Sequence, residues 1–155
     1  MTHSHQPTIY GQHNTPFGSV YLELYGPNLV QCRFDPIKIN HKNSINSALS
    51  AEIAQQIGQA EYQVPLAPKG TAFQQQVWKA LLAIPFGQTA SYQDIANAVD
   101  RPTAVRAVAN AIAANPIAWF IPCHRVIRHN GQLGGYAWGK ALKQRLLDWE
   151  QHNAN

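Results

Sequence analysis

The sequence predicts an α/β fold of the α+β type, with a small antiparallel sheet and a helix first and a mostly helical part after them. Three observations predict this order. Two β-prone runs flank a turn near the N-terminus, a segment with Pro65, Pro68 and Gly70 interrupts the chain, and apolar residues at helical spacing dominate beyond it. We therefore expect an N-terminal α/β domain over residues 1–70 and a second domain over residues 71–155.

The first domain contains the signal for a β-hairpin. Residues 19–25 and 29–34 are rich in Val, Leu, Tyr and Phe, and they flank the Gly-Pro-Asn turn of residues 26–28. Residues 46–59 are expected to form a short helix with alanines and isoleucines on one side. Cys32 lies in the second strand-like run, so we interpret it as a small core residue.

The second domain is predicted to be mostly helical. A capping-box sequence at residues 71–74 begins a helix that ends before residues 84–87, and Ser91 begins another. An alanine-rich helix runs from Thr103 to Ala114, and a last amphipathic helix from Lys140 to Gln151 closes the chain. The second and third of these helices, joined by a tight turn, have the form of a helix-turn-helix. A hairpin turn is expected at His129-Asn130-Gly131.

The alanines of the third helix leave room for a close neighbour. Ala104, Ala107, Ala111 and Ala114 give it a low profile, and Arg106 is its only long basic side chain. A helix that reads base edges usually presents Asn, Gln and Arg, so the pattern favours a wedge in a DNA groove. Packing of the alanines against other helices is the alternative that stays open.

The excess of positive charge lies entirely in the second part of the chain. Residues 1–70 hold four Lys or Arg and four Asp or Glu, whereas residues 71–155 hold eight and four, which accounts for the net charge of +4. This bias favours a polyanionic partner, and a solvated basic face is the alternative. No apolar run matches a membrane span and no signal pattern begins the chain, so we expect a cytoplasmic protein without a membrane partner.

Cys123 is the candidate nucleophile. Two cysteines are too few for a disulfide framework, so both are expected to be thiols in a reducing cytosol. A thiol with a pKa of about 8.5 gives little thiolate at neutral pH without an imidazole, a cation or hydrogen-bond donors nearby. His124 and Arg125 follow Cys123 directly, and Pro122 limits the freedom of the backbone before it.

The sequence Ile-Pro-Cys-His-Arg-Val of residues 121–126 resembles the alkyl-acceptor motif of the O6-alkylguanine-DNA alkyltransferases. The resemblance is dense and in order over residues 71–150, and looser over residues 15–34. Within the family, the second part is most similar to the methyl-acceptor domain of the bacterial adaptive-response protein. Its other matching positions are Phe73-Gln74, Val77-Trp78, Pro85-Phe86-Gly87, Ser91-Tyr92, Arg106-Ala107-Val108, Asn115-Pro116, Gly134-Gly135-Tyr136, Lys143, Leu146-Leu147 and Glu150.

This resemblance implies five residues of the reaction. Cys123 is the acceptor, His124 deprotonates it through a bound water, and Glu150, which follows Cys123 by 27 residues as in the family, holds the His124 tautomer. Asn115 orders the loop around the thiol. Tyr92 donates a hydrogen bond to the guanine ring, so that the base leaves neutral.

Contacts with substrate and DNA are implied in the same way. Arg106 fills the gap left by the flipped nucleotide, and backbone groups of Cys123, Val126 and Ala137 read the guanine edge. Trp138 and Ala118 are expected to flank the alkyl group and to disfavour a bulky one such as benzyl. The remaining candidates for contact with substrate or DNA are Ser91, Arg125, Tyr136 and Lys143.

The expected function is therefore a single, irreversible transfer of an alkyl group, mainly methyl, from O6-alkylguanine in double-stranded DNA to Cys123. O4-alkylthymine stays open as a second substrate. The protein is expected to act as a monomer with no metal or cofactor, and His3 and His5 are interpreted as part of a flexible terminus. Two other classes compete: a lesion-binding module like the alkyltransferase-like proteins, which carry tryptophan in place of the cysteine, and a helix-turn-helix regulator.

Overall fold

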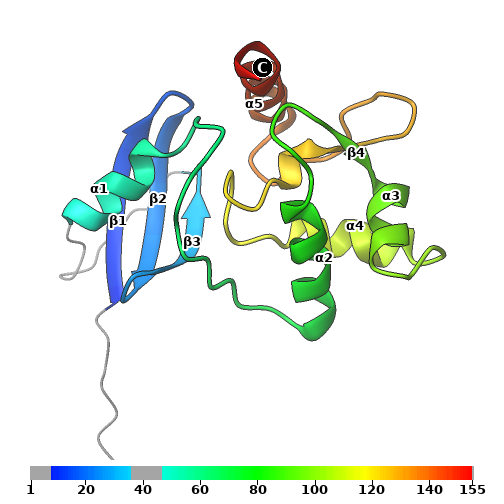
Figure 1. Cartoon of the computed structure of the whole chain (residues 1–155), viewed down its shortest axis with the longest axis horizontal. Coiled ribbons are helices and arrows are strands. Elements are labelled where there is room, and N and C mark those ends of the chain that lie inside the picture. The colour runs from blue at the N-terminus through cyan, green and yellow to red at the C-terminus, as the bar shows by residue number, and fades with distance from the viewer. Residues whose placement is uncertain (1–7, 36–46, 155) are drawn as a thin grey trace, which may run out of the picture.

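The computed structural model describes residues 8–35 and 47–154. Its N-terminal part is a three-stranded antiparallel sheet in the order β1 (Thr8–Thr15), β2 (Gly18–Tyr25) and β3 (Asn28–Arg33) (Figure 1). Helix α1 (Ala48–Gln55) packs on β1 and β2, where His13 of β1 bonds Ser50 of the helix. The predicted hairpin is β2–β3 and is confirmed. The sequence did not reveal β1, because its Gly, Gln, His and Asn residues hide the apolar alternation of a strand.

The inner face of β2 begins the hydrophobic core. Val20, Leu22 and Leu24 alternate along the strand and are buried, and Leu22 pairs with Cys32 of β3. This period of two is what a sheet with one covered face requires. The turn between β2 and β3 contains Gly26 with a φ of +58°. Cys32 is fully buried, so its interpretation as a core residue is confirmed.

Four helices dominate the C-terminal part, as predicted. They are α2 (Ala72–Leu82), α3 (Tyr92–Ala98), α4 (Val105–Ala113) and α5 (Lys140–Asn153). Capping boxes begin α2 at Thr71 and α3 at Ser91, where the hydroxyl of each cap accepts a bond from the third backbone N–H of its helix. α3 and α4 pack on each other and are joined by residues 99–104.

A short parallel pairing precedes the predicted turn at residues 129–131. β4 (Ala90–Ser91) pairs with β5 (Val126–Ile127), which follows the 3₁₀ helix η1 (Cys123–Arg125). The predicted turn at residues 129–131 exists, with a bond from the Arg128 N–H to the Gln132 carbonyl. The residues that follow this turn, 132–139, form a glycine-rich loop.

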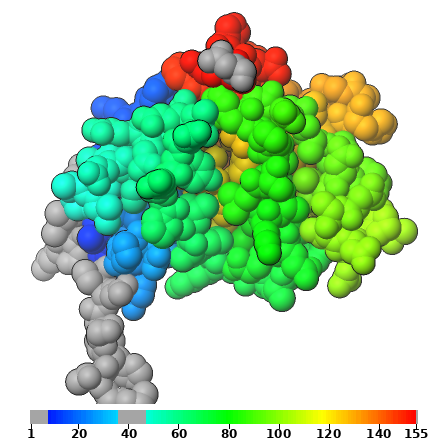
Figure 2. All heavy atoms as spheres, viewed as in Figure 1, coloured from blue at the N-terminus to red at the C-terminus, as the bar shows by residue number. Residues whose placement is uncertain are grey.

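The two parts of the chain share one core. The backbone of Cys32 in β3 bonds Pro116 and Ala118, which lie between α4 and η1. Tyr62 donates its hydroxyl hydrogen to the Phe120 carbonyl, and the Trp149 N–H of α5 donates to the Gly58 carbonyl. Figure 2 shows the N-terminal part, blue to cyan, in contact with the green C-terminal helices, with α5 in red above both. The segment before Cys123 is therefore fixed from the sheet side.

In the described part of the chain, no helix combines the length and the apolar character that crossing a membrane needs.

Candidate active site

Cys123 lies in a cavity of about 530 Å³ at the surface of the C-terminal part. The wall of this cavity on one side is α4, and on the other it is the loop that follows β5. The cysteine is 6% exposed, so the thiol can be reached only from the cavity. The other lining residues are Tyr92, Ala109, Asn110, Ile112, Ala113, Arg128, Gly134, Gly135, Tyr136 and Ala137.

Asn115 ties the thiol to the end of α4. Its side-chain N–H groups donate to the Cys123 Sγ at 3.2 Å and to the Ile121 carbonyl at 2.9 Å, and its Oδ1 accepts from the Ile117 N–H at 3.0 Å. A buried amide with all these partners holds one loop conformation. Asn115 therefore contacts both the thiol and the loop before it, and its role in the reaction stays a prediction.

His124 and Glu150 form a buried pair. The Nε2 of His124 lies 2.6 Å from Glu150 Oε2, and the two side chains are 0% and 1% exposed. Because a carboxylate only accepts, the proton is assigned to Nε2, which leaves Nδ1 with a free lone pair. Nδ1 is buried and has no protein partner among the described residues. The imidazole is thus in the tautomer that a base needs.

Arg125 belongs to this pair and not to a DNA surface, which corrects the expectation for it. Its guanidinium donates to both oxygens of Glu150, at 2.8 and 3.1 Å, and to the Ile84 carbonyl at 2.7 Å. With a side chain 10% exposed, it cannot reach a phosphate. Gly87 donates a fourth bond to the carboxylate at 3.2 Å. Glu150 is therefore held ionised and in place.

Lys143 is likewise buried, which corrects its expected contact with DNA. Its Nζ donates to the Leu133 carbonyl at 2.6 Å and the Gly135 carbonyl at 3.1 Å, so that it ties the loop of the cavity to α5. Burial lowers the pKa of Lys143 to about 8, while the charge of Cys123 opposes the shift. Its positive charge lowers the pKa of the thiol in return.

The resting thiol and imidazole are both neutral. Burial raises the pKa of Cys123 to about 11, against the opposite effects of the Asn115 hydrogen bond and Lys143. Burial also lowers the pKa of His124, although Glu150 favours its charged form. The free protein therefore contains the Cys123 thiol and not the thiolate, and the unprotonated His124 can accept a proton.

Two tyrosines face the thiol. Tyr92, the first residue of α3, lines the cavity, and burial raises its pKa. Gly134 has a φ of +72°, and a Cβ there would lie 2.7 Å from the Tyr92 hydroxyl, so the loop needs glycine at this point. The hydroxyl of Tyr136 is buried without a partner among the described residues. The geometry leaves Tyr92 its phenol hydrogen to donate.

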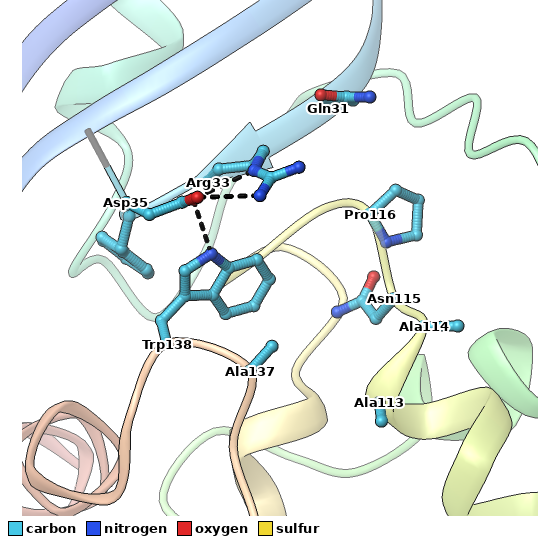
Figure 3. A pocket seen from close by; sticks show the side chains of 10 residues that line it. Gln31, Arg33, Asp35, Ala113, Ala114, Asn115, Pro116, Ala137 and Trp138 are labelled. Atoms are coloured by element: carbon cyan, nitrogen blue, oxygen red, sulfur yellow. Dashed lines mark hydrogen bonds and ion pairs between the residues drawn. The ribbon is translucent and has the colours of Figure 1, made fainter. Parts of the chain in front are cut away.

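Trp138 and Ala118 do not line the cavity of Cys123, which corrects their expected position. The Trp138 indole N–H donates to Asp35 at 2.9 Å. The Trp138 side chain lines a neighbouring cavity of about 640 Å³, together with Arg33 and Asn115 (Figure 3). The bond to Asp35 holds the indole against the N-terminal part. Ala118 is fully buried in the core and bonds the Cys32 carbonyl.

The outer face of α4 carries the remaining candidates for DNA contact. Arg106 and Ala107 are exposed, as are Ala113 and Ala114 at the other end. Ala111 instead faces the core, where its carbonyl accepts the Trp78 indole N–H, so this alanine serves packing. The small outer face lies next to the cavity opening, because the same helix lines it.

Other predicted residues lie where their backbone or caps hold them. Val126 in β5 is buried directly after η1, and the side chain of Ala137 lines both neighbouring cavities. Ser91 caps α3. Sequence reasoning missed Asn110 and Arg128 as cavity residues. Asn110 stands one turn after Arg106 on α4, a spacing that could have indicated it.

No group of three or more His, Cys, Asp or Glu placed to hold a metal ion occurs in residues 8–35 and 47–154. His3 and His5 lie outside the described residues.

Known proteins resemble this chain over nearly its whole length or over its C-terminal part. A family model described as 6-O-methylguanine DNA methyltransferase, DNA binding domain, matches residues 72–152. The chain is 59% identical over 90 residues to the bifunctional transcriptional activator/DNA repair enzyme Ada of Escherichia coli, covering 58% of this chain and 25% of that protein. It is 54% identical over 90 residues to the inducible methylated-DNA–protein-cysteine methyltransferase of Bacillus subtilis, covering 58% and 50%. The chain thus spans at most half the length of these two relatives.

Solved structures match both parts. The Mycobacterium tuberculosis OGT in complex with DNA is 39% identical, covers 93% of either chain and has a TM-score of 0.84. The structure of O6-methylguanine methyltransferase from the same organism is 37% identical, with 96% coverage of either chain and a TM-score of 0.83.

Proposed function

The chain belongs to the O6-methylguanine-DNA methyltransferase family, and from this premise we propose that it repairs DNA by moving a methyl or other alkyl group from O6 of guanine to Cys123. The transfer is irreversible and uses each molecule once. Double-stranded DNA that contains the lesion is the partner, the protein acts as a monomer, and a free acceptor thiol suits the reducing cytoplasm.

One observation carries this proposal: the thiol stands in an open cavity while the residues that control its proton are buried behind it. Cys123 is bonded by Asn115, and the next residue, His124, is paired with Glu150 at 2.6 Å. A nucleophile with an adjacent base that a third group orients is the arrangement of an activated nucleophile. The cavity of about 530 Å³ has room for a base turned out of the stack.

The transfer needs the thiol, His124 and one water that carries the proton. The thiol proton passes through a water to Nδ1 of His124, which gives a thiolate and an imidazolium. The thiolate attacks the alkyl carbon, the S–C bond forms and the C–O6 bond breaks, and its electron pair stays on the purine. Guanine then regains at N1 the proton that O6-alkylation had removed, which equals the proton given up by the thiol. The thioether product is stable, so the protein does not turn over.

Tyr92 assists the leaving group. The developing charge on the purine is costly in a cavity that excludes water, and a phenol hydrogen bond to the ring reduces it. Burial raises the pKa of Tyr92, so its hydroxyl stays protonated as a donor. Lys143 and Arg125 support the site without touching the substrate. Lys143 holds the cavity loop through the Leu133 and Gly135 carbonyls, and Arg125 holds Glu150.

DNA is bound by α3 and α4 acting as a helix-turn-helix. The low outer face of α4 enters the minor groove as a wedge, where an inserted side chain offsets the cost of unstacking a base. Arg106 is the inserted side chain, because it is the long cation on the exposed face of α4. The flipped base then enters the cavity next to the same helix.

Incubation with a duplex that carries O6-[³H-methyl]guanine tests the proposal. We expect one label per protein, located by mass spectrometry on the Cys123 peptide. Label that stays on DNA with a shifted band in a gel would indicate a lesion-binding module. Binding of an undamaged sequence in preference to the lesion would indicate a regulator.

A further inference from the structure

We propose that Trp119 is a positioning residue for the transfer: its indole face holds the His124 ring and favours the imidazolium that forms when the thiol gives up its proton. This inference rests on the proposed function. Trp119 is 1% exposed, and its ring is parallel to the imidazole, with 5.4 Å between centroids and 8° between planes.

The backbone of Trp119 is in an unfavourable conformation. Its φ is +68°, in the left-handed region that a bulky side chain rarely adopts. Such conformations persist where the surroundings impose them, and they gather at functional sites. Here the turn of Ile117 to Ile121 imposes it, with a bond of 3.1 Å from the Ile121 N–H to the Ile117 carbonyl. The left-handed residue directs the indole onto the catalytic histidine.

Two further rings fix the indole in this place. Phe17, in the turn between β1 and β2, stacks on Trp119 with centroids 5.5 Å apart, and Phe86 meets its edge at 6.3 Å. Phe17 also meets Trp149 of α5 edge-on at 5.4 Å. The N-terminal sheet therefore reaches the histidine through a chain of aromatic contacts, Phe17 to Trp119 to His124. A ring held on several sides cannot rotate away when the charge on its neighbour changes.

The Trp119 indole adds to the opposing effects that set the protonation equilibrium of His124. The face of a tryptophan ring attracts a cation within about 6 Å of its centroid, and it does so more strongly where water is excluded. Glu150 favours the imidazolium, whereas burial and the cations Arg125 and Lys143 oppose it. Cys123, Tyr92, Tyr136 and Arg128 are further titratable or charged groups around the site. Trp119 adds attraction to the charged form of His124 and little to the neutral form.

Two substitutions separate this role from simple packing. Trp119→Leu removes the π face and keeps an apolar side chain, and Trp119→Phe keeps a smaller face. We expect the acidic midpoint of the pH–rate profile, where His124 becomes protonated, to fall by about one unit in Trp119→Leu. The rate above that midpoint should be about tenfold lower because less thiolate–imidazolium forms, and Trp119→Phe should recover most of the loss. Equal profiles for wild type and Trp119→Leu, or equal shifts in both variants, overturn the inference.

Fluorinated tryptophans test the same point without changing shape. The chain has four tryptophans, and each added fluorine weakens the negative ring face. The acidic midpoint and the rate above it should fall stepwise with the number of fluorines in wild type, and both should stay constant in Trp119→Phe, where the other three tryptophans serve as the control. A flat series in wild type overturns the inference even where Trp119→Leu does not fold.

Alkylation of Cys123 by iodoacetamide, read at its peptide, supplies a second rate that needs no DNA. A wild type that fails to take methyl from DNA contradicts the proposed function. The iodoacetamide profiles of wild type and the two variants still decide whether Trp119 supports the protonated His124.

Discussion

Each part of the molecule buries one cysteine, and the two thiols differ only in what surrounds them. Cys32 in the sheet is fully buried among apolar side chains, and burial alone raises its pKa. Cys123 is also buried, but Asn115 bonds its sulfur, Lys143 acts on it from α5, and His124 follows it. Burial by itself makes a thiol inert, whereas the same burial beside a base and hydrogen-bond donors prepares one for a single reaction.

The same contrast holds for the parts as a whole. Among the described residues, the buried polar side chain of the N-terminal part is Ser50, whereas five are buried in the C-terminal part. Buried charges destabilise a fold unless they are paired, so proteins keep them mainly where they serve a reaction. The five are Asn115, His124, Arg125, Lys143 and Glu150.

The largest effect is expected at the cysteines themselves. Cys123→Ala should lose all transfer and keep lesion binding, because the thiol supplies the bond and not the packing. Cys32→Ala should keep one label per molecule and lose about 1 kcal/mol of stability from a smaller core residue. Label counting and urea unfolding measure the two. Label on Cys123→Ala would show that Cys123 is not the acceptor, and it would contradict the contrast drawn between the two cysteines.

Glu150→Gln and Leu22→Ala should both destabilise the protein, but for different reasons. Glu150→Gln leaves the buried Arg125 without its carboxylate, at a cost of about 3–5 kcal/mol, and slows transfer. Leu22→Ala leaves a cavity in the sheet, at about 2–5 kcal/mol, with normal transfer per folded molecule.

Acid separates these two variants further. His124 and Arg125 lower the pKa of Glu150 against the effect of burial, so its contribution is present above its unfolded pKa and disappears as pH falls through the folded one. Glu150→Gln should therefore approach wild type in stability at low pH, while Leu22→Ala should not. Urea unfolding from neutral to acidic pH measures both, and a constant gap for Glu150→Gln would contradict the charged pair.

Lys143 should make stability rise with pH. Its pKa is about 8 in the fold against 10.5 without burial, so between these values the unfolded chain binds a proton that the fold has released. Wild type should gain up to about 3 kcal/mol over Lys143→Met across this window. Lys79→Met, which removes an exposed lysine of α2 that does not act on Lys143, is the control and should track wild type.

Arg106→Ala tests the exposed face of α4 against the buried network. Transfer from a duplex should fall about tenfold, because nothing offsets the vacated stack, while transfer from the free base stays unchanged. Rates on the two substrates measure this. An equal loss on both would place Arg106 in the chemistry and not in base extrusion.

The smallest effect is expected at the contact between the two parts. Trp138→Phe removes the hydrogen bond to Asp35 but keeps Arg33 on that carboxylate, so stability should fall by about 1 kcal/mol. Inactivation by O6-benzylguanine should not change, because Trp138 lines the neighbouring cavity. A changed sensitivity to O6-benzylguanine would indicate that Trp138 does shape the cavity of Cys123.

Residues close together in the sequence were enough to predict much of the fold and the centre of the candidate site. The capping boxes at Thr71 and Ser91 and the alternation along β2 depend on neighbours a few residues away, so they could be predicted from the sequence. Cys123 and His124 are adjacent, so the motif placed the proposed nucleophile next to its proposed base. Strand β1 could not be predicted from the sequence, because it is its pairing with β2, and not its composition, that makes it a strand.

Tertiary structure alone decided which charges are buried and which way each ring faces. Arg125 and Lys143 have the composition of DNA-binding residues, yet packing of α5 turns both inward onto Glu150 and the loop carbonyls. The orientation of Trp138 depends on Asp35, which lies just after β3 and 103 residues earlier in the chain. The orientation of Trp119 depends on the turn that places its ring on His124. Sequence specifies what a side chain can bond, but the partners come from distant segments, and only packing brings them within reach.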